Sequence, residues 1–210
     1  MSASSIDLCG LIRLIEMRGN GRLIVGIAGP PGSGKSTIAG HLEISLNANQ
    51  PGFAAILPMD GFHFDDMLLE KLNRRTRKGA PDTFDVGGFG HLLMRLRNNT
   101  EDSVAVPVFD RDIEIARGGA QLIARDVSVI IVEGNYLLLK MAPWLSLKSL
   151  FDLTVMVDTR IETLRARLTK RWAGYNLAPA EIHRRVEEND LPNGKFVMTE
   201  STEPDCRLEN

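Results

Sequence analysis

The chain has 210 residues, of which 43% are hydrophobic and 25% are charged, close to the average for globular proteins. This length predicts a single domain over residues 1–210, and this composition argues against a disordered chain. Lys and Arg number 25 against 27 Asp and Glu, which gives a formal net charge of -2. Because proteins that bind nucleic acid usually carry a basic excess, we expect no nucleic-acid partner, although a local basic patch around a phosphate site is compatible with this charge.

The N-terminal sequence predicts a cytoplasmic protein. Residues 1–22 contain Asp7 and Glu16 within an apolar stretch and lack the cationic start of a secretory signal. No stretch approaches the roughly 20 apolar residues of a membrane span, so we expect no membrane insertion. Cys9 and Cys206 lie far apart without metal-type spacing, and we expect them to be free thiols.

Short apolar runs alternate with helical patterns along the chain. A helix is expected over residues 5–18, with Ser4 or Ser5 as its cap, and a buried strand over residues 22–29. A Gly-rich turn then leads into a helix over residues 35–46. Further strands are expected over residues 54–58, 103–109, 127–134 and 150–158, and further helices over residues 65–77, 88–98, 160–172 and 179–189.

This alternation predicts an α/β fold in which a mostly parallel central sheet has helices on both faces, a three-layer α/β/α sandwich. No internal repeat, low-complexity tract or interdomain linker interrupts the pattern. The helices expected over residues 160–193 are polar and charged, which favours a helical lid on the surface over a part of the core.

The Gly-rich turn carries a phosphate-binding motif. Its sequence GPPGSGKST, residues 29–37, matches G-x-x-x-x-G-K-[ST] between an expected strand and an expected helix. Glycines let backbone N–H groups curl toward phosphate oxygens, and the positive end of the following helix adds to the attraction. The strand–loop–helix context favours nucleotide binding over a chance match. The expected ATP-binding residues are Gly29, Pro30, Pro31, Gly32, Ser33, Gly34, Lys35, Ser36 and Thr37.

Within this loop, Lys35 is expected to reach the β- and γ-phosphates, and the Ser36 hydroxyl to bind Mg²⁺. The motif by itself predicts the P-loop NTPase fold without choosing between kinases, GTPases, motors and transporters. The chain contains no N-K-x-D guanine motif and no L-S-G-G-Q transporter signature. These absences favour a kinase.

Two carboxylates follow expected strands. Asp60 comes after residues 54–58 and Glu133 stands near the end of residues 127–134. Sheets of this type bind ligands beyond the carboxyl ends of their strands, so both should lie near the P-loop. Asp60 can accept the proton of an attacking hydroxyl, and Glu133 can hold the metal. The alternatives are a helix N-cap for Asp60 and a solvated strand end for Glu133.

These residues together resemble the uridine kinase, phosphoribulokinase and pantothenate kinase family. The matching segments are GIAGPPGSGKST, MDGFH, KGAPDTFD, VPVFDRD, VEGNYLLL and RARLTKR, spread over residues 24–193. The phrases VEGNYLLL and NDLPNG most resemble the bacterial group of kinases linked to fructose transport. The resemblance implies ATP, Mg²⁺, transfer of the γ-phosphoryl group to an alcohol, and a closing lid.

The resemblance also implies roles for individual residues. Asp60 matches the catalytic acid, Glu133 the carboxylate on the metal side, and Arg167 and Arg171 the arginines of the lid. The two arginines are four residues apart, so we expect them on one helix face, pointing together at the phosphates. A solvated helix face is the alternative for this pair.

The acceptor is expected to differ from that of uridine kinases. Lys78-Gly79 stands where those enzymes carry a ribose-binding Asp, Phe109 replaces a Tyr, and no base-contacting His follows. Polar candidates near strand ends favour a sugar-like acceptor first and a pantothenate-like acid second. The candidate acceptor residues are Asp60, His63, Lys78, Asp85, Arg111, Arg117, Asn135 and Tyr136.

Several alternatives stay open. A lone histidine such as His63 is more often structural or on the surface than in contact with substrate. Asp85 is also suited to capping a helix, and Arg111 and Arg117 to surface ion pairs. At the level of function, the alternatives are an ATP-binding regulator without an acceptor and a nucleotide-gated partner of a transport system. A homodimer is compatible with the sequence.

Overall fold

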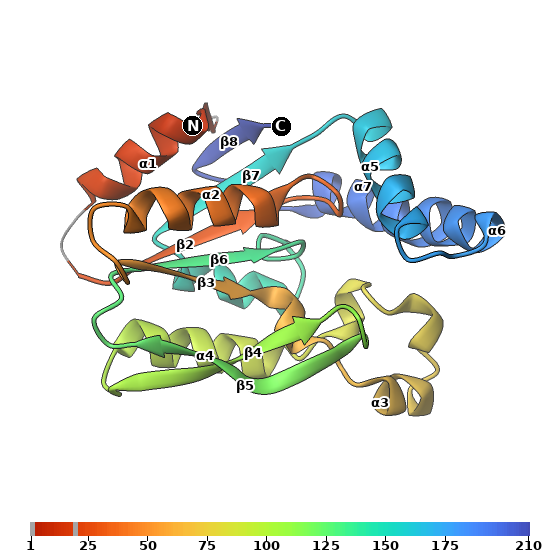
Figure 1. Ribbon diagram of the computed structural model, residues 1–210, viewed down its shortest axis with the longest axis horizontal. Coiled ribbons are helices and arrows are strands. Elements are labelled where there is room, and N and C mark those ends of the chain that lie inside the picture. The colour runs from red at the N-terminus through yellow and green to blue at the C-terminus, as the bar shows by residue number, and fades with distance from the viewer. Residues whose placement is uncertain (1–2, 19–20) are drawn as a thin grey trace.

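The computed structural model, which describes residues 3–18 and 21–210, contains a six-stranded parallel sheet with strand order β1-β8-β7-β2-β6-β3 (Figure 1). Each neighbouring pair in this sheet runs parallel. The mostly parallel sheet expected from the apolar runs is thereby confirmed. The strands are β1 Ser4–Ser5, β2 Leu23–Ala28, β3 Ala54–Pro58, β6 Val129–Gly134, β7 Leu153–Asp158 and β8 Cys206–Glu209.

The sheet separates two hydrophobic cores, because successive residues of a strand point to opposite faces. On β2, Val25 and Ile27 pack in the core under helices α1 and α2, whereas Ile24 and Ala28 pack in the core under α4. This arrangement is the expected three-layer sandwich. The helices are α1 Leu8–Met17, α2 Lys35–Asn47 and α4 Val86–Asn98, with a 3-10 helix at Trp144–Leu150 that packs beside α4.

A separate antiparallel ribbon lies beside α4 (Figure 1). It pairs β4, Ser103–Asp110, with β5, Ile115–Ala124, and its register shifts between Val106 and Val108. At one end the ribbon is rooted in the core by Val104, Val106 and Ile123. At the other end its turn, residues 111–114, reaches the carboxyl ends of the parallel strands. β5 was not expected from the sequence.

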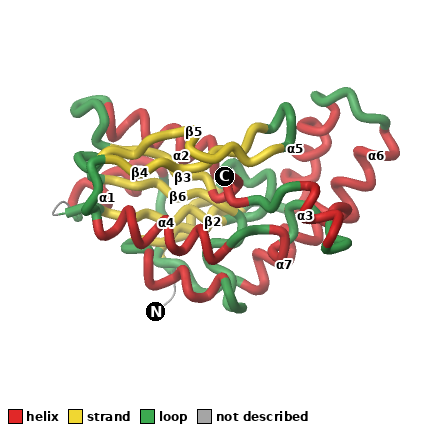
Figure 2. Tube along the Cα trace, turned by 90° about the horizontal axis from the view of Figure 1, so that it is seen from below, coloured by secondary structure: helices red, strands yellow, loops and turns green. Residues whose placement is uncertain are grey.

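The lid is a helical unit beyond the carboxyl ends of the strands, as the views in Figures 1 and 2 agree. It begins with α5, Ile161–Ala173, and α6, Pro179–His183. The helix then continues as a π-helix over Arg184–Asp190 and as α7 over Leu191–Glu200. The lid has its own small core of Leu164, Leu168, Val186 and Leu191, whereas Val197 of α7 already belongs to the core under α4.

Several local expectations were wrong. Asp7, rather than Ser4 or Ser5, caps α1, since its Oδ1 accepts the Gly10 N–H at 2.7 Å and the two serines form β1. The helix expected over residues 65–77 is interrupted after α3, Asp66–Lys71, because Asn73 adopts a left-handed φ of 54°. A 3-10 turn over Arg75–Arg77 follows.

In the described parts of the chain, helices are too short or too polar to cross a membrane.

Candidate active site

The loop between β2 and α2, residues 29–34, is shaped by glycines at positive φ. Gly32 has φ 79° and Gly34 has φ 91°, values that residues with a Cβ rarely adopt. Gly34 is the N-cap of α2 and supplies no side chain to its first turn. The N-terminal N–H groups of α2 and their positive dipole end therefore stay available to an anion.

The outer side of the loop is fixed by contacts with its carbonyl groups. Arg167 Nη1 lies 3.5 Å from the Gly32 carbonyl oxygen and 3.3 Å from that of Ser33, and Asn210 Nδ2 donates to the Ser33 oxygen at 2.7 Å. A Cβ on Gly29 would lie 2.9 Å from both Ser33 Oγ and the Val157 carbonyl oxygen. Arg167 and Asn210 thus hold the Gly32 and Ser33 carbonyl groups, and the buried Ser33 Oγ has no hydrogen-bond partner among the described residues.

Lys35 is the cation of this loop. Its side chain is buried, and its ammonium group donates to the Pro30 carbonyl oxygen at 3.0 Å. Burial lowers the pKa of Lys35 to about 8, although Glu133 and Asp60 act to raise it. A buried ammonium beside two carboxylates is suited to binding a polyanion, whose charge would favour its protonated form.

Asp60 and Glu133 lie side by side at the carboxyl ends of β3 and β6. Pro58 pairs with Glu133 across the two strands, and Asp60 follows two residues later in the 3-10 turn Met59–Phe62. Asp60 Oδ2 accepts a bond from Arg111 Nη2 at 2.5 Å. This adjacency follows from the parallel register, and it brings two carboxylates to the phosphate loop.

The two carboxyl groups have opposite pKa shifts. Burial acts to raise the pKa of Asp60, but His63, Arg111 and Lys35 outweigh it and hold the pKa below its usual value. Burial raises the pKa of Glu133, with a further contribution from the Asp60 charge, while the charges of Lys35 and Arg111 and, to a smaller extent, a hydrogen bond from Ser36 oppose the rise. Asp60 is therefore ionised at neutral pH, and a further cation near Glu133 would favour the ionised form of that carboxyl group.

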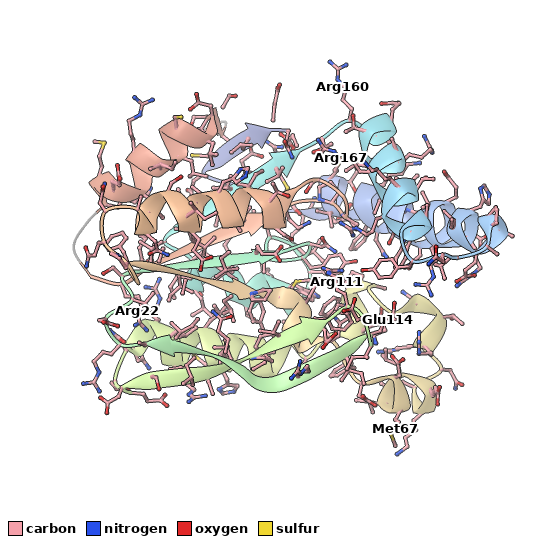
Figure 3. All side chains as sticks on the ribbon, viewed as in Figure 1. Arg22, Met67, Arg111, Glu114, Arg160 and Arg167 are labelled. Atoms are coloured by element: carbon pink, nitrogen blue, oxygen red, sulfur yellow. The ribbon has the colours of Figure 1, made fainter. Side chains whose placement is uncertain are left out.

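These groups open onto one cavity of about 300 Å³. The P-loop contributes Lys35 and Ser36, and the strand ends contribute Asp60, His63, Glu133 and Asn135. The segment before α4 and the ribbon contribute Arg75, Lys78, Phe84, Phe109, Arg111 and Glu114. The lid contributes Arg171, Trp172, Arg184, Arg185, Asn189 and Asp190. Figure 3 shows Arg111 and Glu114 together at the end of the ribbon that faces the lid.

Two predicted residues have supporting contacts in addition to their place at the cavity. His63 Nδ1 lies 2.7 Å from the Asp60 carbonyl oxygen, and its ring lies 4.1 Å from that of Phe84 and 4.6 Å from that of Phe109. Burial lowers the pKa of His63, so its ring is neutral at pH 7. Lys78 donates to Asp66 Oδ1 at 2.6 Å and to the Glu114 carbonyl oxygen at 2.7 Å.

Outside the phosphate loop, four predicted residues do not line this cavity. Tyr136 is fully buried and donates to the Gly79 carbonyl oxygen at 2.5 Å, with its pKa raised by burial. Asp85 caps α4 by accepting the Gly88 N–H at 2.8 Å, and Arg117 pairs with Asp110 at 3.2 Å on the ribbon. Arg167 contacts the Gly32 and Ser33 carbonyl oxygens, whereas Arg171 lines the cavity, so the two arginines do not line it together. That both point at bound phosphates stays a prediction.

Other cavity residues were not singled out from the sequence. Arg185 lies over the Trp172 ring at 4.5 Å, and Trp172 Nε1 donates to Asp190 Oδ2 at 2.7 Å. Burial raises the pKa of Asp190, while the Trp172 bond opposes the rise. The only sequence signal for these residues was the polar character of the lid segment, which does not say which side chains face inward.

Among residues 3–18 and 21–210, no three or more His, Cys, Asp or Glu side chains gather as a metal-binding group. Mg²⁺ is commonly held by one or two carboxylates together with substrate phosphates and water. The neighbouring oxygens of Ser36 and Glu133 fit that mode, because both are hard ligands beside the phosphate loop.

A model for the phosphoribulokinase / uridine kinase family matches residues 24–172 of this chain. A Schizosaccharomyces pombe protein named "Putative uridine kinase C227.14" is 32% identical over 198 residues, covering 90% of this chain and 83% of that protein. "Uncharacterized protein YggC" of Escherichia coli is 34% identical over 190 residues, covering 90% and 78%. The crystal structure titled "putative fructose transport system kinase" from Silicibacter sp. TM1040 is 36% identical, covers 98% of this chain and 100% of that chain, and has a TM-score of 0.89.

Proposed function

Since this chain belongs to the phosphoribulokinase / uridine kinase family of P-loop kinases, we propose that it transfers the γ-phosphoryl group of ATP to a hydroxyl group of a sugar-like small molecule. The observation that carries this proposal is the meeting of Lys35, Asp60 and Glu133, from three different elements, in one cavity. A cation for phosphates, an ionised carboxylate and a second oxygen ligand are what phosphoryl transfer to an alcohol requires.

Asp60 is the general base in this proposal. Its carboxylate takes the proton of the acceptor hydroxyl as the hydroxyl oxygen forms a bond to the γ-phosphorus and the bond from that phosphorus to the bridging oxygen of ADP breaks. The low pKa of Asp60 keeps it ionised at neutral pH. Arg111, which pairs with Asp60 in the structure, must loosen its contact so that the hydroxyl group can approach.

The P-loop residues Lys35 and Ser36 bind the phosphate groups. Lys35 neutralises charge that builds up on the oxygens between the β- and γ-phosphates, and the N–H groups of residues 32–36 supply further donors. Mg²⁺, held by Ser36 and Glu133 together with the phosphates, would add positive charge that stabilises the transferring group.

The lid, residues 160–193, closes over this site. Arg171 lines the cavity and is placed to pair with phosphate oxygens, whereas Arg167 supports the P-loop through its carbonyl groups. Closure would exclude water and so limit wasteful hydrolysis of ATP. A π-helix within the lid, Arg184–Asp190, is a feature that is frequent at functional sites.

The acceptor end of the cavity supports a polar substrate. Lys78, Arg111, Asn135 and Asn189 line it, and the rings of His63 and Phe109 supply a flat wall. Because each buried polar group needs a partner, a polyhydroxyl compound fits this lining better than an apolar one. We rank sugar-like acceptors above pantothenate-like acids, and both above uridine.

The test is a product screen in which ATP and Mg²⁺ are incubated with sugars, sugar derivatives, pantothenate and nucleosides, and the phosphorylated products are read by mass spectrometry. The Asp60→Asn substitution keeps the size of the proposed base but removes its proton acceptor. We expect transfer to fall roughly 10²-fold while ATP binding survives.

Two results would contradict the proposal. Full transfer by the Asp60→Asn variant would show that Asp60 is not the general base. ATP binding with no phosphorylated product from any acceptor would favour a regulator over an enzyme. Asp85→Asn is the matched control, because Asp85 caps α4 and does not line the cavity.

A further inference from the structure

Three cationic side chains contact Glu114 at the acceptor end of the cavity, two at its carboxylate and one at its backbone carbonyl oxygen. Arg75 Nη2 lies 3.9 Å from Glu114 Oε2, Arg185 Nη1 lies 3.5 Å from Glu114 Oε1, and Lys78 donates to the Glu114 carbonyl oxygen at 2.7 Å. They come from the segment after α3 and from the π-helix of the lid, while Glu114 lies in the turn of the ribbon. All four residues line the cavity.

The Glu114 carboxylate makes only long contacts with the two guanidinium groups. Charge-assisted hydrogen bonds between such groups are usually about 2.7–2.9 Å long. The backbone of Glu114 is also in the left-handed region, with φ 53°, which is uncommon for a residue with a long side chain. Glu114 therefore lies between Arg75 and Arg185 without the close pairing that would make it their best partner.

The two arginines are nevertheless held firmly in place. Arg185 donates from Nε to Glu181 Oε1 at 2.8 Å and stacks on the Trp172 ring. Arg75 Nη2 lies 2.8 Å from Asp66 Oδ2, and Asp66 does not line the cavity. Guanidinium groups that are already oriented lose little freedom when an anion binds, so their arrangement favours recognition of a carboxylate or phosphate.

We propose that the acceptor carries an anionic group, a carboxylate or a phosphate, which binds between Arg75 and Arg185 in place of the Glu114 carboxylate. The acceptor class is thus a polyhydroxy acid or a phosphorylated polyol, and this assignment rests on the function proposed above. Its hydroxyl end reaches Asp60 beside Arg111, while its anionic end joins the lid to the wall of the cavity. Binding of the correct acceptor would then draw the lid closed.

The first experiment measures anion binding without turnover. The P-loop is saturated with Mg²⁺ and a non-hydrolysable ATP analogue, and inorganic phosphate is titrated as the probe by calorimetry. We expect saturable binding that Arg75→Gln and Arg185→Gln each weaken about tenfold or more, the scale of one lost hydrogen bond to a charged group. Added NaCl should weaken it further.

The Glu114→Gln variant gives the sharpest test, because the proposal predicts that it binds phosphate more tightly than the wild type. Removing the resident negative charge should tighten phosphate binding roughly tenfold, whereas a purely structural role for Glu114 would leave binding unchanged or weaken it. Arg165→Gln is the matched control, since Arg165 pairs with Glu187 on the lid, 2.7 Å apart, and does not line the cavity. It should leave binding within about twofold of the wild type.

The second experiment compares transfer to glucose, gluconate and glucose 6-phosphate, and to similar sets built on shorter polyols. A higher kcat/KM for an anionic member than for the neutral member of the same set, with the advantage lost in the Arg185→Gln variant, supports the proposal. Whether the preferred member is the acid or the phosphate ester tells which anion the site binds. Equal or better use of the neutral members would overturn the anion site while the kinase function stands. If no member is phosphorylated, the proposed function fails, and absence of phosphate binding in both the wild type and Glu114→Gln overturns the anion site on its own.

Discussion

The phosphate loop and the acceptor end of the cavity are held in place by different kinds of interaction. The loop is one contiguous segment, residues 29–34, whose shape depends on left-handed glycines and on contacts with its backbone carbonyls. The acceptor end joins three segments through side-chain ion pairs, and the Arg75 and Arg185 side chains are 40% and 27% exposed. Exposed ion pairs usually contribute less than about 1 kcal/mol each, so the long contacts of Glu114 with the two arginines can break when a substrate binds, while the loop keeps its shape.

The largest expected effect lies at the rigid end. Lys35→Ala removes the buried ammonium group that would bind the phosphates in both the ground and transition states, so we expect transfer to fall roughly 10²- to 10³-fold and ATP affinity to drop. Steady-state kinetics and calorimetry with ATP measure the two effects. Unchanged ATP affinity together with unchanged transfer would show that the loop does not bind nucleotide.

The next largest effects are expected from the two lid arginines, whose substitutions should change different kinetic quantities. Arg171→Ala removes a cation that lines the cavity, and we expect kcat to fall about tenfold to a hundredfold with little change in ATP affinity. Arg167→Ala removes the support of the Gly32 and Ser33 carbonyls, so we expect mainly weaker ATP binding. If the two variants have the same kinetic signature, both residues act on the phosphates and the distinction drawn here is wrong.

A smaller effect is expected from pH. The pKa of Lys35 is about 8 in the nucleotide-free protein, and bound phosphates favour its charged form, so its pKa in the complex is higher. ATP affinity should therefore be constant below about pH 8 and fall by up to about tenfold per pH unit above it. Lys35→Arg keeps the charge throughout this range, so its ATP affinity, measured by calorimetry, should not show that fall.

The smallest effect tests a residue outside the cavity. Asp85→Ala removes the N-cap of α4, and we expect the free energy of unfolding to fall by about 1 kcal/mol without a change in kcat/KM. Urea denaturation and kinetics with the identified acceptor measure both quantities. A selective rise in KM for the acceptor would return Asp85 to the substrate site.

The contrast between one contiguous loop and a site built from distant segments also explains what the sequence could predict. The fold class, the family and the loop between β2 and α2 could be predicted because apolar strands and a contiguous motif encode them locally. β5 could not, because the stretch IARGGAQLIA is largely exposed and lacks a clear apolar alternation. β8 has only four residues and owes its place to pairing with β7.

The direction in which a side chain points was the other feature that the sequence could not predict. Tyr136 and Asn135 both follow β6, yet Asn135 lines the cavity and Tyr136 lies in the core. Position after a strand therefore predicted nearness to the site without predicting which way each side chain points. Arg75, Glu114 and Arg185 were missed because their association depends on three segments far apart in the sequence, and no local pattern records it.

The two ends of the antiparallel ribbon are expected to differ in how readily they unfold locally. Its base is fixed by the buried side chains of Val104, Val106 and Ile123, whereas the residues near its turn are half-buried or exposed. Regions with few buried apolar contacts unfold locally at lower free energy than the core. The turn that carries Arg111 and Glu114 can therefore behave as a cooperative unit of its own, opening and closing many times while the strands of the parallel sheet stay folded.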